Sequence, residues 1–134
     1  MLKTIKIRNF HSIGNEQELL FKIGAKDHLD NSSVKNGKDY INLVNAIIGS
    51  NASGKTNVLK AISFLFWLTK DSYTSGLQPN QLLPILAHKL HENESTFLSI
   101  EFSDAGVDYQ YSVELDKQSI KKECRATTLC FNGY

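Results

Sequence analysis

Hydrophobic and polar residues alternate with a period of two at the beginning of the chain and in its last third. Such alternation is typical of strands with one buried face. It predicts a first strand over residues 2–10 and a second over residues 18–23, which we expect to form an antiparallel pair. The later strands are expected over residues 98–103, 109–115 and 120–131, with polar turns between them. The chain should therefore begin with a strand pair and end in an antiparallel meander.

The middle of the chain has a different pattern. A run over residues 43–48 that is apolar except for Asn45 predicts a buried strand, which we expect to begin near Tyr40. Residues 55–69 are apolar nearly all round, which predicts a helix that is covered on most sides. Polar loops are expected over residues 24–39 and 71–81, and a short helix over residues 82–91.

One motif with a chemical meaning lies between this strand and this helix. Four residues separate Gly49 from Gly54, Lys55 and Thr56, which is the spacing of a phosphate-binding loop. The glycines allow consecutive amides to turn inward around a phosphate. Lys55 can then reach the phosphates, Thr56 can offer its hydroxyl to Mg²⁺, and the helix directs its N-terminal dipole at the anion. A Gly-Ser turn with an incidental lysine is the alternative.

Composition limits the classes of protein that remain. With 134 residues, 41% of them hydrophobic, the chain is long enough for one domain with a core. Its net charge of +1 indicates neither a nucleic-acid nor a membrane partner. We expect Cys124 and Cys130 to be reduced, buried or half-buried thiols. No run is long enough to span a membrane and no signal peptide is evident, so a cytoplasmic location is expected.

Asn51 narrows the class of the loop, because Gly-x-Asn-x-x-Gly-Lys-Ser/Thr is the form found in ABC-type ATPases. Together with the first strand pair and the late meander, the loop resembles the SMC/RecF-like branch of these ATPases. Within that branch the chain is most similar to bacterial AAA-family ATPases related to OLD-family and abortive-infection defence proteins. The resemblance covers essentially the whole chain, as the N-terminal lobe of such a protein.

This resemblance implies an α/β fold of the P-loop NTPase class, an ABC-type head lobe over residues 1–134 with a β-meander subdomain. Within it, residues 1–23 would form the strand pair, 40–70 the loop strand and helix, and 95–134 the meander. ATP and Mg²⁺ are the implied ligands, with Lys55 as the catalytic cation and Thr56 on the metal. The implied nucleotide-binding residues are Arg8, His11, Ser12, Gly49, Ser50, Asn51, Ala52, Ser53, Gly54, Lys55, Thr56 and Asn57. For Arg8, an ordinary solvated strand position is the alternative.

The resemblance also implies partners. ATP would join two heads face to face, so a second ATPase lobe and a second head, in a homodimer, are expected. Nucleic-acid processing or phage defence follows by analogy alone. No membrane partner is expected.

The sequence departs from a complete ATPase of this kind in two ways. It has no apolar run ending in Asp-Glu, the Walker B strand, because Glu101 and Glu114 occupy alternating positions of the meander. It also has no signature segment, since residues 74–78 lie at the wrong place in the chain, although Gln78 or Gln81 could be the glutamine that senses Mg²⁺. We therefore expect an ATPase whose isolated chain is inactive or very weak.

Two alternatives remain open. The chain could be a non-hydrolysing nucleotide-binding or regulatory module that acts through a partner chain, which the missing acids favour. A small phosphotransferase or GTPase is disfavoured by Asn51 and by the strand pattern.

Overall fold

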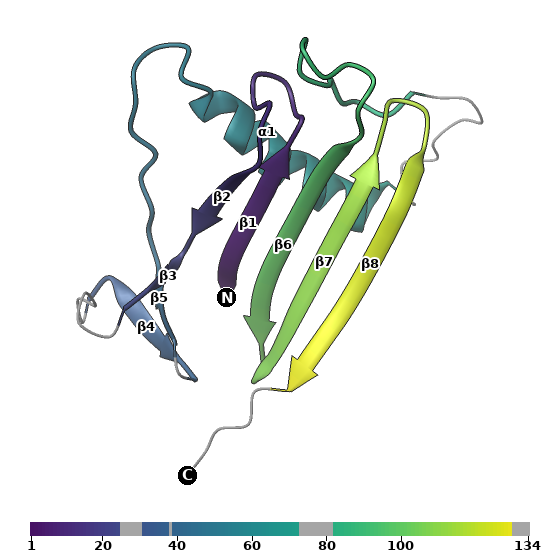
Figure 1. The fold of residues 1–134 in the computed structure, drawn as a ribbon. Coiled ribbons are helices and arrows are strands. Elements are labelled where there is room, and N and C mark those ends of the chain that lie inside the picture. Colours follow the sequence, from purple (N-terminus) through teal and green to yellow (C-terminus); the bar gives the residue numbers. More distant parts are fainter. Residues whose placement is uncertain (25–30, 38, 73–81, 130–134) are drawn as a thin grey trace.

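The computed structural model describes residues 1–24, 31–37, 39–72 and 82–129 (Figure 1). Its main sheet has five strands in the order β2-β1-β6-β7-β8, and each neighbouring pair is antiparallel. The strands are β1 (Leu2–Arg8), β2 (Gln17–Leu20), β6 (Thr96–Asp104), β7 (Val107–Leu115) and β8 (Ile120–Leu129). The structure thus confirms the predicted N-terminal strand pair and the late meander, but the second predicted strand, residues 18–23, is interrupted after Leu20, and residues 22–23 belong to another sheet.

Helix α1 (Lys55–Phe66) crosses one face of this sheet and continues into a π-helical turn, η1 (Trp67–Asp71). The core lies between the two layers. On the sheet side, fully buried aliphatic side chains come from alternate positions of β1, β6 and β7, among them Ile7, Leu98 and Val113. Phe64 and Leu65 face them from the helix. Because strand side chains alternate between faces, the residues between these core positions lie on the opposite face of the sheet, and most of them are polar.

A second sheet of three short strands lies beside the first. Its order is β3-β5-β4, formed by β3 (Lys22–Ile23), β4 (Ser33–Asn36) and β5 (Asp39–Asn42). The prediction of a loop over residues 24–39 is therefore wrong for β4. Strand β4 has no apolar alternation and is held by backbone pairing to β5, across a turn in which Gly37 has φ 63°.

Residues 43–48 do not form the buried strand that their apolar run predicts. They have no regular secondary structure, and the side chains of Val44 and Ile48 are 79% and 92% exposed. Apolar composition alone does not make a strand, because the backbone groups need a neighbouring strand to pair with. In the described part of the chain no strand lies beside this run.

The predicted helix over residues 82–91 is also absent. The chain is irregular there instead, with a bend at Pro84 and a turn at residues 89–90; Leu83 and Ile85 are buried, and Leu82 and Leu86 are exposed. Backbone bonds hold it at both ends: Leu83 N donates to Lys117 O at 2.8 Å, and His11 N donates to Leu86 O at 2.7 Å. Residues 73–81, which include Gln78, Gln81 and the signature-like segment, lie outside the described residues.

Three further predictions concern the cover of the helix, the cysteines and membrane spans. Helix α1 is covered on the sheet side alone, since Leu59 and Phe66 are 57% and 58% exposed. Cys124 is a free thiol as predicted, but it is exposed rather than buried, because it lies on an edge strand; Cys130 is outside the described residues. None of the described helices is both long and apolar enough to cross a membrane.

Candidate phosphate-binding site

The loop that precedes α1 closes around the side chain of Lys55. The Lys55 ammonium donates to Gly49 O at 2.8 Å and to Ser50 O at 2.5 Å, and it lies 3.3 Å from Ser53 Oγ. Gly49 and Ser50 begin the loop, whereas Lys55 is the first residue of the helix. The ammonium group therefore joins the two ends of the loop.

The two glycines of the motif occupy positions where a side chain would not fit. Gly54 has φ 91°, in the left-handed region that favours glycine. A Cβ on Gly54 would lie 3.3 Å from Ser12 Oγ, and a Cβ on Gly49 would lie 2.7 Å from Ser53 Oγ. Ala52 also has a positive φ of 64°, which is a strained conformation for alanine. The loop is thus held in a tight turn that most sequences could not adopt.

The helix that follows begins with unsatisfied amide groups. Gly54 is its N-cap and offers no side chain, and the first turn contains no acidic residue. Asn57 N and Val58 N both donate to Gly54 O, at 2.9 and 3.1 Å. Within the described residues, the amides of Lys55 and Thr56 donate to no protein acceptor. Such an uncapped N-terminus attracts anions through its free N–H groups and its dipole.

The turn between β1 and β2 lies against this loop. Ser12 Oγ accepts a hydrogen bond of 2.7 Å from the Asn57 side chain, so two predicted site residues 45 positions apart are in contact. His11 is next to Ser12 in the same turn and packs edge-on against Phe10, with ring centroids 4.6 Å apart. Burial, and secondarily the positive charge of Lys60, lowers the pKa of His11. A neutral imidazole therefore faces the site at pH 7.

Asn9 holds this turn in place, and sequence reasoning missed its role. Its side chain is fully buried and donates to the carbonyls of His91 and Glu94, at 3.0 and 2.7 Å, while it accepts a bond of 2.8 Å from His88 N. The Thr96 hydroxyl in turn donates to Asn9 O at 2.6 Å. The available signal was a small amide residue at the end of an alternating strand, which tolerates the φ of 52° found there.

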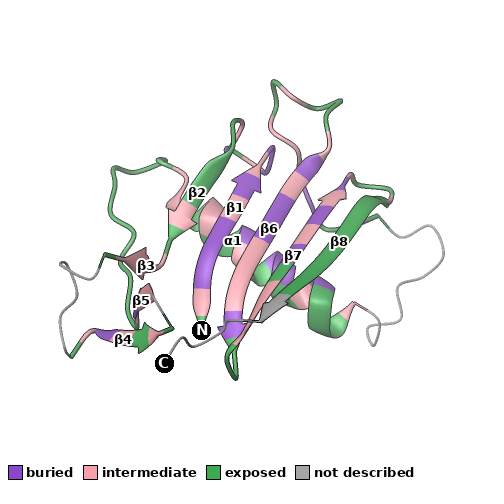
Figure 2. Cartoon of the chain, turned by 60° about the horizontal axis from the view of Figure 1, so that its bottom comes forward, coloured by how far each residue is buried: buried purple, intermediate pink, exposed green. Residues whose placement is uncertain are grey.

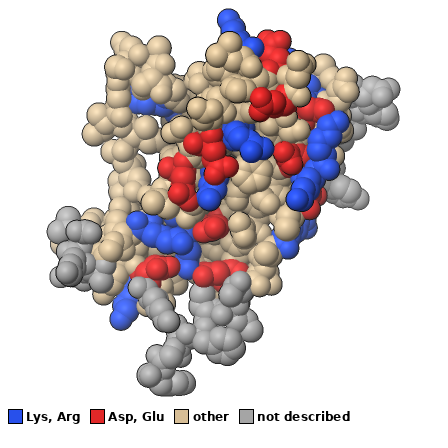
Figure 3. Space-filling model, viewed as in Figure 1, with Lys and Arg blue, Asp and Glu red and all other residues tan. Residues whose placement is uncertain are grey.

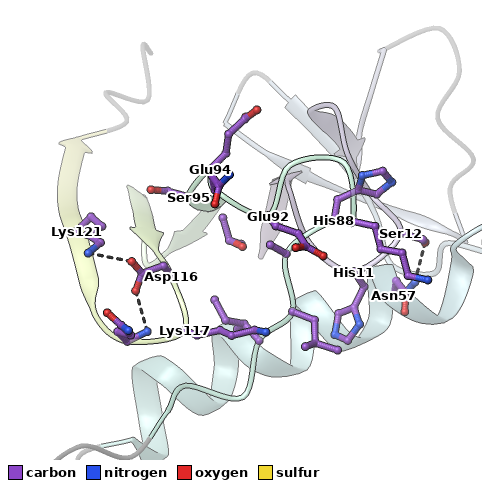
Figure 4. A pocket seen from close by; sticks show the side chains of 17 residues that line it. His11, Ser12, Asn57, His88, Glu92, Glu94, Ser95, Asp116, Lys117 and Lys121 are labelled. Carbon is purple, nitrogen blue, oxygen red and sulfur yellow. Dashed lines mark hydrogen bonds and ion pairs between the residues drawn. The ribbon is translucent and has the colours of Figure 1, made fainter.

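A cavity of about 990 Å³ opens beside the loop (Figure 4). His11, Ser12 and Asn57 form the wall that it shares with the loop. Residues 85–89 and 92–96 and the turn between β7 and β8 form the other walls. The cavity therefore joins the start of α1 to segments that are distant in sequence.

Charges of both signs line this cavity. The Asp116 carboxylate lies 2.9 Å from the Lys121 ammonium and accepts bonds from the amides of Gln118 and Ser119. The Lys121 contact, followed by these amide bonds, lowers the pKa of Asp116 to about 2. Asp116 is therefore ionised and paired at neutral pH, so its pair with Lys121 adds no net charge to the cavity.

Arg8 is the predicted site residue that the structure places away from the loop. It follows Ile7, so its side chain projects from the face of the sheet opposite to α1. Its guanidinium lies 3.3 Å from the Glu114 carboxylate and 5.5 Å from the ring centroid of Phe97. Figure 3 shows this face, on which basic and acidic side chains are interspersed over the strands.

Glu101 and Glu114, the two acids of the meander considered for Walker B, also point away from the loop. Glu114 pairs with Arg8, and Glu101 lies 3.7 Å from the Lys22 ammonium. Among the residues that the structure describes, no group of three or more His, Cys, Asp or Glu side chains could hold a metal ion. Thr56 is exposed at the start of the helix, where its hydroxyl is the expected metal ligand. Within the described residues, neither Glu101 nor Glu114 therefore lies beside the phosphate loop.

The comparison with known families gives one match. The family described as "AAA domain, putative AbiEii toxin, Type IV TA system" matches residues 44–131, about two thirds of the chain. The matched segment contains the loop, α1 and the meander. No curated protein matches the chain.

Proposed function

The chain belongs to this family of AAA domains, whose fold is that of P-loop NTPases, and on that premise we propose that it binds ATP and Mg²⁺ through residues 49–57. The observation that carries the proposal is the closed loop itself. The Lys55 ammonium is held at the loop carbonyls of Gly49 and Ser50, directly before a helix whose first amides have no capping side chain. A positive group and free amides at one point favour a polyphosphate.

The roles of the loop residues follow from their chemistry. Lys55 would exchange its carbonyl contacts for phosphate oxygens and would neutralise charge on the transferred group. Thr56 would offer its hydroxyl to Mg²⁺, which itself would neutralise phosphate charge. The amides of residues 50–56 would surround the phosphates, as their tight turn requires glycine at both ends.

The nucleoside end of ATP would enter the adjoining cavity. Its shared wall contains Ser12, which Asn57 holds next to the loop, and the neutral ring of His11. A hydroxyl and an uncharged imidazole suit a ribose and a base better than a phosphate. Arg8 has no part in this proposal, because its guanidinium pairs with Glu114 on the other face of the sheet.

We further propose that this domain is one lobe of an ABC-type head of the SMC/RecF-like branch. The exposed apolar run over residues 43–48 and the uncovered side of α1 at Leu59 support it, since such surfaces favour burial against more protein. ATP hydrolysis would then require groups from that second lobe and from a second head. The family description supports a biological role in a type IV toxin–antitoxin system or in abortive infection.

A second candidate is a module that binds the nucleotide without hydrolysing it and acts through a partner chain. The ion pairs of Glu101 and Glu114 favour it, because they leave both carboxylates on the face away from the loop.

Calorimetric titration with Mg-ATP tests the proposed binding. Lys55→Ala should weaken binding by about tenfold or more, since it removes a charge-assisted contact to the phosphates. Lys70→Ala is the matched control, because it removes an exposed lysine from η1, at the other end of the helical segment. Equal affinity of the wild type and of Lys55→Ala would refute the proposed role of the loop.

A further inference from the structure

Strand β8 forms one edge of the five-stranded sheet along its whole length. It spans ten residues and pairs with β7 on one side, while no other described strand pairs with it. All side chains of residues 120–127 are exposed, as Figure 2 shows. A long edge strand has a row of backbone donors and acceptors available for another strand. This edge lies apart from the phosphate loop, which adjoins the turn between β1 and β2.

The charges of β8 are arranged symmetrically about Cys124. Glu123 precedes it and Arg125 follows it, and these two residues project from the same face of the strand. Within one chain the Arg125 guanidinium lies 2.8 Å from the Glu123 carboxylate. No other residue of the strand is acidic, and its remaining charges are Lys121 and Lys122.

We propose that two copies of the chain pair antiparallel through β8, with Cys124 of one copy opposite Cys124 of the other. A two-fold axis perpendicular to the sheet relates strands paired in this way, so some residue of β8 must face its own copy. With Cys124 at that position, Glu123 of each copy faces Arg125 of the partner copy. The pairing joins the two five-stranded sheets into one sheet of ten strands.

Other registers of the same pairing are less favourable. Centring on Glu123 would place two glutamates opposite each other, and centring on Arg125 would oppose two arginines. Centring on Lys122 would oppose two lysines. In the proposed register Lys121 and Lys122 face Thr127 and Ala126 of the partner copy, which are neutral. Like charges directly opposite destabilise a strand pair and opposite charges stabilise it, so the charge pattern favours the register centred on Cys124, the one in which Glu123 faces Arg125.

Sedimentation equilibrium without nucleotide tests the proposal. The wild type should form a dimer, and either Glu123→Arg or Arg125→Glu should weaken dimerisation by about tenfold, because each places two like-charged pairs across the interface. An equimolar mixture of the two variants should dimerise again, since every pair then combines opposite charges. Recovery in the mixture also shows that both variants are folded.

Cross-linking checks the register directly. In a Cys130→Ser background, mild oxidation should join two chains through Cys124, because residues directly opposite in antiparallel strands have Cβ atoms about 5 Å apart. Moving the thiol two positions along the strand, with Cys124→Ser and Lys122→Cys, places it opposite Ala126 and should abolish the cross-link. A wild-type chain that stays monomeric, a dimer that both charge variants retain, or equal cross-linking of the two cysteine variants would overturn the proposal.

Discussion

At the scale of single residues, Gly49 is the most sharply constrained position of the loop. A Cβ there would lie 2.7 Å from Ser53 Oγ, a distance that real Cβ contacts do not show. We predict that Gly49→Ala weakens Mg-ATP binding by about tenfold or more, because Ser53 and the Lys55 contacts must shift. Thermal unfolding should hardly change, since the loop is exposed. Calorimetric titration and a melting curve measure both effects.

A second substitution separates a steric cause from a general loss of loop flexibility. Ser53→Ala in the Gly49→Ala background removes the clashing hydroxyl and leaves the nearest contact at the Ser53 Cβ, 3.4 Å away. Affinity should recover relative to Gly49→Ala, with Ser53→Ala alone as the reference. Affinity that stays as low as in Gly49→Ala would show that the clash with Ser53 is not the cause.

Asn9 carries a prediction about stability rather than binding. Asn9→Ala removes a buried side chain and leaves two partly buried carbonyls and one amide without it, which should lower the free energy of unfolding by about 2–4 kcal/mol. Urea denaturation measures the change. Asn93→Ala is the matched control, because Asn93 is exposed in the same segment and should be nearly neutral. Similar losses in both variants would contradict the role assigned to Asn9.

At the scale of elements, sequence reasoning succeeds where local pattern and tertiary environment agree. In β1, β6 and β7 the apolar residues alternate because one face meets α1, so the period of two predicts the strands. Residues 43–48 have a strong apolar pattern, but they lack a neighbouring strand in the described part of the chain and stay irregular. Strand β4 is the reverse case. Its sequence has no apolar alternation, but it forms a strand because β5 lies beside it and pairs with it.

Helix α1 tests how far burial decides stability within one element. Phe64 is 6% exposed and packs against Trp67, with ring centroids 5.6 Å apart, whereas Phe66 is 58% exposed. We predict that Phe64→Ala lowers the free energy of unfolding by about 3 kcal/mol or more, and that Phe66→Ala lowers it by less than about 1 kcal/mol. Urea denaturation of the two variants provides the comparison. Equal losses would mean that the outer side of α1 is covered in solution.

At the scale of the whole molecule, the site combines local and distant contributions. Residues 49–57 are contiguous, so their spacing alone predicts a phosphate loop. The contact of Ser12 with Asn57 depends on how β1 and α1 pack, and the resemblance to a family suggested Ser12 where no local pattern did. The cavity depends on residues 85–89, which lie in a segment that was predicted to be a helix and is irregular instead. Long-range placement of this kind is not encoded in short-range periodicity.

The arrangement of acids over the molecule leads to a prediction about turnover. Hydrolysis requires a group that orients water beside the phosphates, and both meander glutamates that face the opposite side of the sheet are held in ion pairs. We therefore expect the chain to bind Mg-ATP and to release phosphate no faster than Lys55→Ala does at saturating ATP, as measured by a coupled phosphate assay. Release above that level would mean that an acid of this chain reaches the site.

Glu92 and Glu94 are the acids to test in that event, because both line the cavity beside the loop. Both are exposed, but Glu94 already lies 2.7 Å from His91 Nδ1, whereas Glu92 makes no ion pair with another described residue. A water-orienting role would make Glu92→Gln lower the turnover and leave Mg-ATP affinity nearly unchanged, since the loop itself holds the phosphates. If turnover is absent from the isolated chain and appears on mixing with a second lobe, the missing carboxylates come from that lobe.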